Sequence, residues 1–133
     1  MQDLRPTLLP EATMDERLRF IKHQDKDILF IDLTNASKQD LLILLPRIKA
    51  VVTEQPRDSV LVLADFTGAA IDKDVATRVK EVLVFDRPYV KKAAWVGTEE
   101  LPNVFYENFK AFSRRDLPMF KTQSEALEWL VAA

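Results

Sequence analysis

The chain has 133 residues, the usual size of one domain, and its 47% hydrophobic and 30% charged residues are typical of a globular protein. It has no cysteine, which excludes disulfides, thiolate metal ligands and a cysteine nucleophile and fits a reducing cytoplasm. A net charge of −2 lacks the basic excess typical of nucleic-acid binders, and two glycines are too few for a glycine-rich phosphate loop. We therefore expect a cytoplasmic domain that binds no nucleic acid.

The first elements in chain order are an arm and a hairpin. Residues 1–16 contain two prolines and no hydrophobic periodicity, which predicts an irregular arm ahead of a domain over residues 17–133. Arg17–His23 alternates weakly and predicts a strand. The polar stretch Gln24–Asp27 predicts a turn, and the continuous apolar run Ile28–Leu33 predicts a strand buried on both faces. The short link between the two strands makes them an antiparallel hairpin.

The middle of the chain alternates helix and strand. Asn35–Gln55 has leucines and valines at helical spacing, with Ser37 as a plausible N-cap. Val60–Phe66 is apolar throughout and predicts the central strand. Asp72 is a candidate N-cap for a second helix, which ends at Arg87, just before a proline.

The last third repeats this alternation. Tyr89–Val96 predicts a strand, Leu101–Ser113 an aromatic-rich helix, and Pro118–Lys121 a short strand. Thr122 and Glu125 form a capping-box pattern that opens a final helix. Strands joined through helices pair in parallel by right-handed crossovers. The order therefore predicts an α/β fold with a mixed, largely parallel sheet, an antiparallel first strand and about four helices.

Four segments resemble the SpoIIAA-like family, relatives of the STAS domain of anti-sigma-factor antagonists that are also described as STAS/SEC14-like. The resemblance covers roughly residues 15–131 and lies in the order and spacing of the segments RLRFIKHQDKDILFIDL, LADFTGAAID, PYVKKAAWVG and FKTQSEALEWL. It implies a STAS-like fold, protein-binding or ligand-binding roles and no established catalysis.

The resemblance also carries two specific expectations. In phospho-regulated STAS domains a serine at the start of the helix after the central strand is phosphorylated. The matching stretch here is Asp72, Lys73 and Asp74, which has no hydroxyl, so the phosphorylation switch is not transferred to this chain. The SEC14 side of the resemblance implies a groove for apolar ligands.

Polar residues follow the central strand and its neighbours. Asp65, Thr67 and Gly68 come where the central strand ends, and Asp32 and Thr98 should lie at neighbouring strand ends. Ligands gather at the carboxyl ends of parallel strands, so these residues are candidates for the polar rim of a binding site. The alternative is turn chemistry, in which Asp and Thr bond to nearby backbone and Gly permits a tight bend.

A receiver-like set of residues and the single histidine are two further candidates for a functional site. Asp32, Asp65, Thr98 and Lys121 each follow a strand, as the acceptor Asp, Thr and Lys do in two-component receiver domains. The acidic pair that holds Mg²⁺ in those domains is missing, and the opening hairpin does not fit. The single histidine, His23, is a candidate general base or metal ligand, but an exposed turn residue explains it more simply.

The helix Leu101–Ser113 carries more aromatic residues than one buried stripe requires. Phe105, Phe109 and Phe112 recur at helical spacing, and Tyr106 lies beside them. The simpler interpretation is an ordinary core face. The functional one is a lid over an apolar cavity, or a helix that docks on a partner or a membrane.

We therefore predict a non-enzymatic regulatory or protein-interaction module of STAS-like type, without cofactor or metal. The alternative is a carrier or sensor of a lipophilic small molecule or lipid, with transient peripheral contact at a membrane. A homodimer is compatible with either function. The candidate binding residues are Asp65, Thr67, Gly68, Asp72, Phe105, Tyr106, Phe109 and Phe112.

Overall fold

The computed structural model describes residues 16–99, 101–114 and 117–132. Its strands are β1 (Leu18–His23), β2 (Lys26–Asp32), β3 (Val60–Asp65), β4 (Val90–Val96) and β5 (Met119–Phe120). Its helices are α2 (Lys38–Thr53), α3 (Lys73–Asp86), α4 (Asn103–Ser113) and α5 (Gln123–Val131). The irregular arm predicted for residues 1–16 lies outside the described residues, apart from its last residue.

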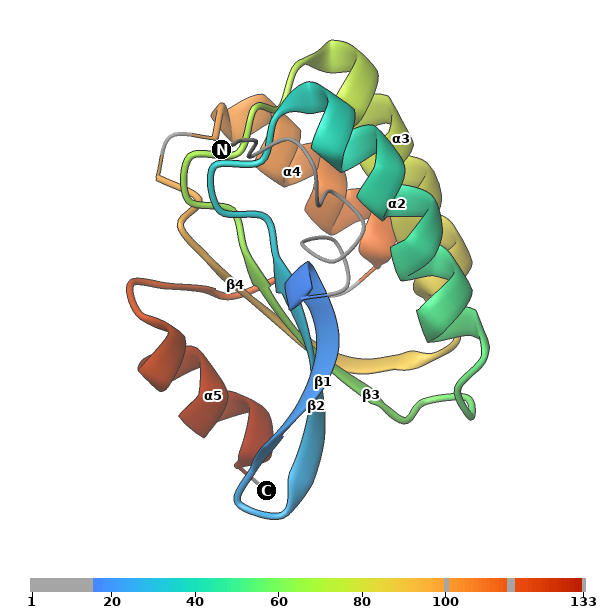
Figure 1. Cartoon of the computed structure of the whole chain (residues 1–133), viewed down its shortest axis with the longest axis vertical. Coiled ribbons are helices and arrows are strands. Elements are labelled where there is room, and N and C mark those ends of the chain that lie inside the picture. Colours follow the sequence, from blue (N-terminus) through green and yellow to red (C-terminus); the bar gives the residue numbers. More distant parts are fainter. Residues whose placement is uncertain (1–15, 100, 115–116, 133) are drawn as a thin grey trace, which may run out of the picture.

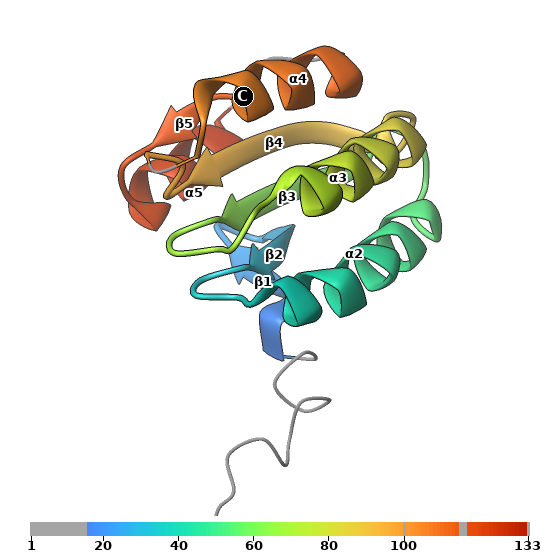
Figure 2. The same cartoon turned by 90° about the horizontal axis from the view of Figure 1, so that it is seen from above.

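The strands form one mixed sheet in the order β1-β2-β3-β4-β5. β1 pairs with β2 antiparallel, and all later neighbours pair in parallel. Helices α2, α3 and α4 cover one face of this sheet, and α5 covers the other (Figures 1 and 2). The predicted α/β fold is therefore confirmed, including the antiparallel first strand.

Strand β3 lies at the centre of the sheet and is buried along its whole length. Val62 and Ala64 belong to the core beneath α2, α3 and α4, whereas Leu61 and Leu63 belong to the core beneath α5. Alternate residues of a strand point to opposite faces, so a strand covered on both sides must be apolar throughout. Burial on both faces therefore explains why the sequence of β3 is a continuous apolar run.

The hairpin between β1 and β2 is tighter than predicted. The chain turns through only two residues, Gln24 (φ 51°) and Asp25 (φ 66°), and Lys26 already pairs with His23. Positive φ at both positions is the signature of a type I′ turn, which matches the right-handed twist of the strands. The prediction missed it because neither residue is glycine. Arg17 is helical, so β1 begins one residue later than predicted.

The predicted helix starts are confirmed at two helices and partly at a third. Ser37 and Asp40 form a complete capping box at α2. Asp72 Oδ1 accepts a hydrogen bond from the Val75 backbone N–H at 2.9 Å and begins α3. At α5, Thr122 Oγ1 accepts a hydrogen bond from the Glu125 backbone N–H, which is one half of the predicted capping box. Each cap satisfies a backbone donor that the first turn of a helix leaves unpaired.

Lys92 holds the C-terminal end of α5 on the sheet. Its Nζ donates to the backbone oxygens of Trp129 and Ala132, each at 3.0 Å, and lies 4.6 Å from the centre of the Trp129 ring. A register shift between β3 and β4 falls at this point, next to the exposed Lys91. A cation at the C-terminal end of a helix is favourable, because the last carbonyls there have no partner within the helix.

Replacing Lys92 with Met should therefore destabilise the protein by about 1 kcal/mol, the usual net value of charge-assisted hydrogen bonds at a helix end. Met keeps the apolar length of the side chain and removes the donors. Urea unfolding measures the change, with Lys91→Met as the neighbouring control. An equal loss in the control would contradict the assignment of the capping role to Lys92.

Candidate functional site

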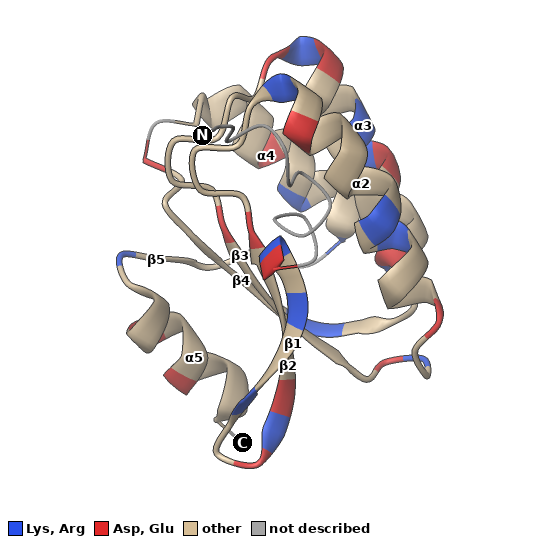
Figure 3. Ribbon diagram, viewed as in Figure 1, with Lys and Arg blue, Asp and Glu red and all other residues tan. Residues whose placement is uncertain are grey.

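Asp32 and Asp65 lie next to each other at the carboxyl ends of β2 and β3, where acidic segments end two neighbouring strands (Figure 3). Each aspartate accepts two hydrogen bonds from the threonine two residues later. Asp32 Oδ1 accepts from the backbone N–H of Thr34 at 3.0 Å and from its hydroxyl at 2.6 Å. Asp65 Oδ1 accepts from the N–H of Thr67 at 3.0 Å and from its hydroxyl at 2.7 Å. These repeated contacts are turn chemistry.

The second carboxylate oxygen of Asp65 is also occupied. Asp65 is 5% exposed, and its Oδ2 accepts a hydrogen bond at 2.8 Å from Gln123, the first residue of α5. The Thr98 hydroxyl, which also follows a strand, donates to the Met119 sulfur at 2.7 Å. These side chains therefore tie the strand ends to one another and to α5.

The structure brings part of the predicted polar rim together, with Gly68 in a tight bend beside Asn35. Asp65 and Thr67 bond to each other, and the exposed Lys121 has no described contact with the Asp65 carboxylate. Within residues 16–99, 101–114 and 117–132, no group of three or more His, Asp or Glu side chains has an arrangement that could hold a metal ion. The arrangement fits the structural explanation of these residues better than the receiver-like one.

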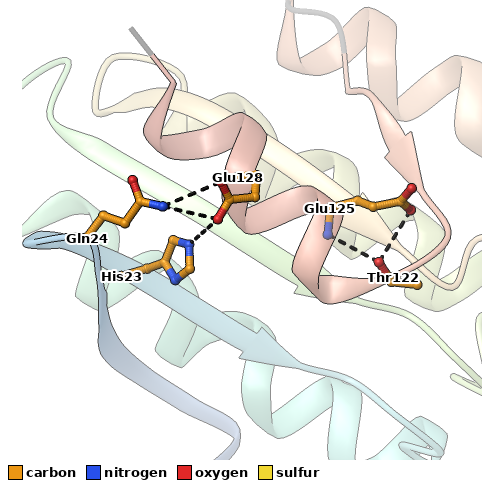
Figure 4. Close-up of polar contacts among 5 residues, drawn as sticks. All are labelled: His23, Gln24, Thr122, Glu125 and Glu128. Carbon is orange, nitrogen blue, oxygen red and sulfur yellow. Dashed lines mark hydrogen bonds and ion pairs between the residues drawn. The ribbon is translucent and has the colours of Figure 1, made fainter.

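His23 is less exposed than the sequence indicated, because the β1–β2 turn is attached to α5 (Figure 4). His23 Nε2 lies 2.9 Å from Glu128 Oε2, and the Gln24 amide donates to the same oxygen at 3.1 Å. The simpler interpretation, an exposed turn residue, is right that His23 adjoins the turn. It did not include the contact with Glu128. A hydrogen bond across 105 residues of sequence leaves no local signal.

Helix α4 divides its aromatic residues between core and surface. Phe109 is fully buried, with its ring centre 5.7 Å from that of Trp95 in an edge-on arrangement. Phe105 stacks on Phe109 at 6.3 Å and is half-buried. The Tyr106 hydroxyl donates to the backbone oxygen of Leu117 at 2.6 Å. The interpretation of this helix as a core face is therefore confirmed for its inner side.

The outer side of α4 forms a groove with α3. The α3–α4 groove has a volume of about 310 Å³ and is lined by Lys73, Ala76, Thr77, Lys80, Val104, Phe105, Asn108 and Phe109. Val104 is 61% exposed on one wall. Beside the groove, Phe112 is 41% exposed, with Lys80 Nζ 5.3 Å from the centre of its ring. The charged side chains that line this groove are both lysines.

The neighbouring α2–α3 groove differs in charge. It has a volume of about 270 Å³, and Lys49 Nζ lies 3.7 Å from the centre of the exposed Phe85 ring. Its lining also includes Arg78 and Glu81, so both signs of charge are present. Each groove thus combines an exposed phenylalanine with a lysine, but only the α3–α4 groove is lined by positive charge alone.

Asp72 is the N-cap of α3 and directly precedes Lys73, which lines the α3–α4 groove. The backbone hydrogen bond from Val75, together with the side chain of Lys38, lowers the pKa of Asp72. Lys38 Nζ lies 3.1 Å from Asp72 and 3.4 Å from Asp74. Both of these carboxylates already have a cationic partner.

A further hollow lies between the sheet and the helical layer, and none of the aromatic residues of α4 lines it. This inner cavity has a volume of about 70 Å³ and almost entirely apolar walls. Asp86, the last residue of α3, lines it and is 7% exposed. Its Oδ1 is buried and has no hydrogen-bond partner among the described residues. Burial raises the pKa of Asp86 to about 7, and the charge of Lys49 opposes that rise.

The topology and the helical layers define a SpoIIAA-like fold. The chain is similar to the crystal structure of an uncharacterised DUF3478-family protein with a SpoIIAA-like fold from Shewanella loihica PV-4. The TM-score is 0.66 at 17% sequence identity, over 85% of this chain and 91% of that one. The fold that the sequence motifs predicted is thereby confirmed.

The other comparisons add no relative. No protein-family model matches the sequence, and no curated protein gives a significant match. None of the helices in the described parts of the chain has both the length and the apolar character needed to cross a bilayer. Function must therefore be argued from the surface and the interior of this chain.

Proposed function

We propose that this protein is a non-enzymatic interaction module whose α3–α4 groove binds an acidic, amphipathic segment of a partner protein. The observation that carries the proposal is the combination of exposed apolar side chains, Val104 and Phe112, with the lysines Lys73 and Lys80 around one groove. An amphipathic helix inserts its apolar residues into such a groove. Carboxylates on the flanks of that helix would pair with the lysines and set its orientation.

The polar groups at the strand ends support a binding role more than a catalytic one. A general base needs a carboxylate that is free to take a proton from a substrate. Both oxygens of Asp65 accept hydrogen bonds from the protein itself, and the Thr67 hydroxyl donates to Asp65. At the start of α3, Asp72 is engaged in capping the helix.

The size of the hollows also favours a partner protein over a carried lipid. Sites that enclose a drug-sized or lipid-sized ligand have volumes of about 300–1,000 Å³ and bury most of the ligand surface. The inner cavity is about 70 Å³, too small for an acyl chain. The α3–α4 groove reaches about 310 Å³ but lies on the surface between two helices. An open groove of this kind suits a row of side chains from another helix.

Two synthetic helical peptides test the proposal. One carries leucines at positions i, i+4 and i+7 flanked by glutamates, and the other replaces every glutamate with lysine. We expect the acidic peptide to bind and to shift the amide resonances of α3 and α4, and the basic peptide to bind at least tenfold more weakly. Fluorescence anisotropy gives the affinities, and two-dimensional NMR identifies the surface.

Matched variants locate the site. Val104→Ser together with Phe112→Ser should weaken binding of the acidic peptide at least tenfold, because both side chains are exposed at the α3–α4 groove. Phe85→Ser removes a phenylalanine that is 53% exposed at the α2–α3 groove and should leave the affinity unchanged. Equal loss in both variants would contradict the proposed site. Binding to anionic vesicles without binding to the peptide would show a lipid surface as the partner instead.

A further inference from the structure

We propose that the inner cavity is a second binding site, which takes a small neutral molecule with a short apolar body and one hydroxyl group. This site is separate from the α3–α4 groove, and neither Val104 nor Phe112 lines it. The proposal rests on three features of the cavity: its apolar walls, its size and the one buried carboxyl group that faces it.

The walls are built from both layers of the domain. Val62, Ala93 and Trp95 contribute from the sheet, and Ile48 and Val79 contribute from α2 and α3. All five side chains are buried and belong to the main hydrophobic core. Apolar walls favour an apolar ligand body, because its transfer from water is favourable and costs no hydrogen bonds.

Asp86 is the one carboxyl group in these walls, whose other polar residues are Arg87 and Ser113. Its Oδ1 is buried without a partner among the described residues, although buried polar atoms nearly always have one. As the last residue of α3, it also places a carboxyl group at the end of a helix that favours cations. Both effects oppose a carboxylate here, so a hydrogen-bond donor from a ligand would remove a cost that the described protein groups leave uncompensated.

The charges around Asp86 decide between ligand classes. Lys49 of α2 acts on it electrostatically, and Arg87 also lines the cavity while its Nε donates to the Phe112 backbone oxygen at 2.7 Å. The charge of Lys49 already acts on the carboxyl, which makes a further cation, from an amine, less favourable than a neutral group. A hydroxyl can donate to the ionised carboxyl and accept from the protonated one.

The volume limits the length of the ligand. An apolar cavity of about 150 Å³ binds benzene, which has six carbons. The inner cavity has about half that volume, so an alcohol of about three non-hydrogen atoms, such as ethanol, marks the upper end of what fits. Long-chain alcohols and fatty acids would require the helical layer to move.

The test uses the full chain and three small probes: ethanol, ethylamine and xenon. We expect ethanol to cause saturable shifts of the Asp86 carboxyl carbon and of the Val62 and Val79 methyl groups in NMR spectra. Ethylamine should bind at least fivefold more weakly. Xenon should reach the same methyl groups without shifting the Asp86 carboxyl.

Two variants separate the polar group from the volume. Asp86→Leu removes the carboxyl and should weaken ethanol binding at least fivefold, whereas Ala93→Leu fills the cavity and should abolish binding of both ethanol and xenon. Spectra of the free variants confirm that each is folded. Ethanol affinity that is unchanged in Asp86→Leu, tighter binding of the amine, or no saturable shift in the parent protein would each overturn the proposal. None of these results depends on the peptide-binding groove.

Discussion

Replacing Asp86 with Asn should make the protein more stable relative to the parent as the pH rises from 4 to 8. The pKa of Asp86 is raised from 3.8 to about 7 because the carboxyl is buried. An acid whose pKa is higher in the folded state contributes stability below its unfolded pKa, and this contribution is lost as the pH rises through the folded pKa. At about 1.4 kcal/mol per pKa unit, the loss is on the order of 4 kcal/mol.

Asn is uncharged across this range, so the variant should lack the decline that Asp86 causes. Urea unfolding at pH values between 4 and 8 measures the difference in free energy of unfolding between parent and variant. Asp25→Asn is the matched control, because Asp25 is an exposed turn residue with φ 66°, a conformation that Asn tolerates well. A difference between the parent and Asp86→Asn that stays constant with pH would contradict the assignment.

Lys49 provides an independent check on the same group. The charge of Lys49 lowers the pKa of Asp86, against the larger effect of burial. Lys49→Met removes that charge, so the decline in stability attributed to Asp86 should move to higher pH. If the decline moves to lower pH, the electrostatic account of this pair is wrong.

The layer structure could be predicted because each of its elements carries a local signal. The apolar run of β3 requires burial on both faces, and Ser37 and Asp72 are caps that act within three residues of their own position. The turn at Gln24 and Asp25 could not be predicted in the same way. Its positive φ values are imposed by pairing of the strands, because neither residue favours that conformation as glycine does.

The candidate site was less accessible to prediction. The helical spacing of Phe105, Phe109 and Phe112 correctly indicated one stripe, but how far a stripe is covered depends on neighbouring elements. Phe109 is buried against Trp95, whereas Phe112 lies at the C-terminal end of α4, where its ring remains 41% exposed. The burial of Asp86 could not be predicted, because an Asp at a helix end near a proline is usually exposed.

The α3–α4 groove and the inner cavity are lined by different residues of α3. The α3–α4 groove uses Lys73 and Lys80 from the outer side of this helix, whereas the inner cavity uses Val79 and Asp86 from the side that faces the sheet. A helix packed on a sheet at one side and partly exposed at the other can serve both purposes with different residues. The proposed partner binding and the proposed small-ligand binding should therefore be separable by mutation.

Replacing Gly97 with Ala should destabilise the protein by about 3–5 kcal/mol, far more than the same change at Gly68. Both glycines have positive φ, +73° at Gly97 and +71° at Gly68, which costs other residues about 1–3 kcal/mol. At Gly97 an added Cβ would also lie 2.6 Å from the Thr67 backbone nitrogen and 2.9 Å from Asp65 Oδ1. Overpacking of this kind adds about 1–3 kcal/mol.

The surroundings of Gly97 cannot move away from an added methyl group. The Thr67 nitrogen donates to Asp65, and its carbonyl accepts from the Asn35 N–H at 2.7 Å, so relief would break the strand-end turn. At Gly68 the added Cβ would meet mainly the end of the exposed Asn35 side chain, which is free to rotate into solvent, so we expect a loss of about 1–2 kcal/mol. Urea unfolding of both variants measures the two losses. Equal destabilisation would mean that the Asp65–Thr67 turn yields more easily than its hydrogen bonds indicate.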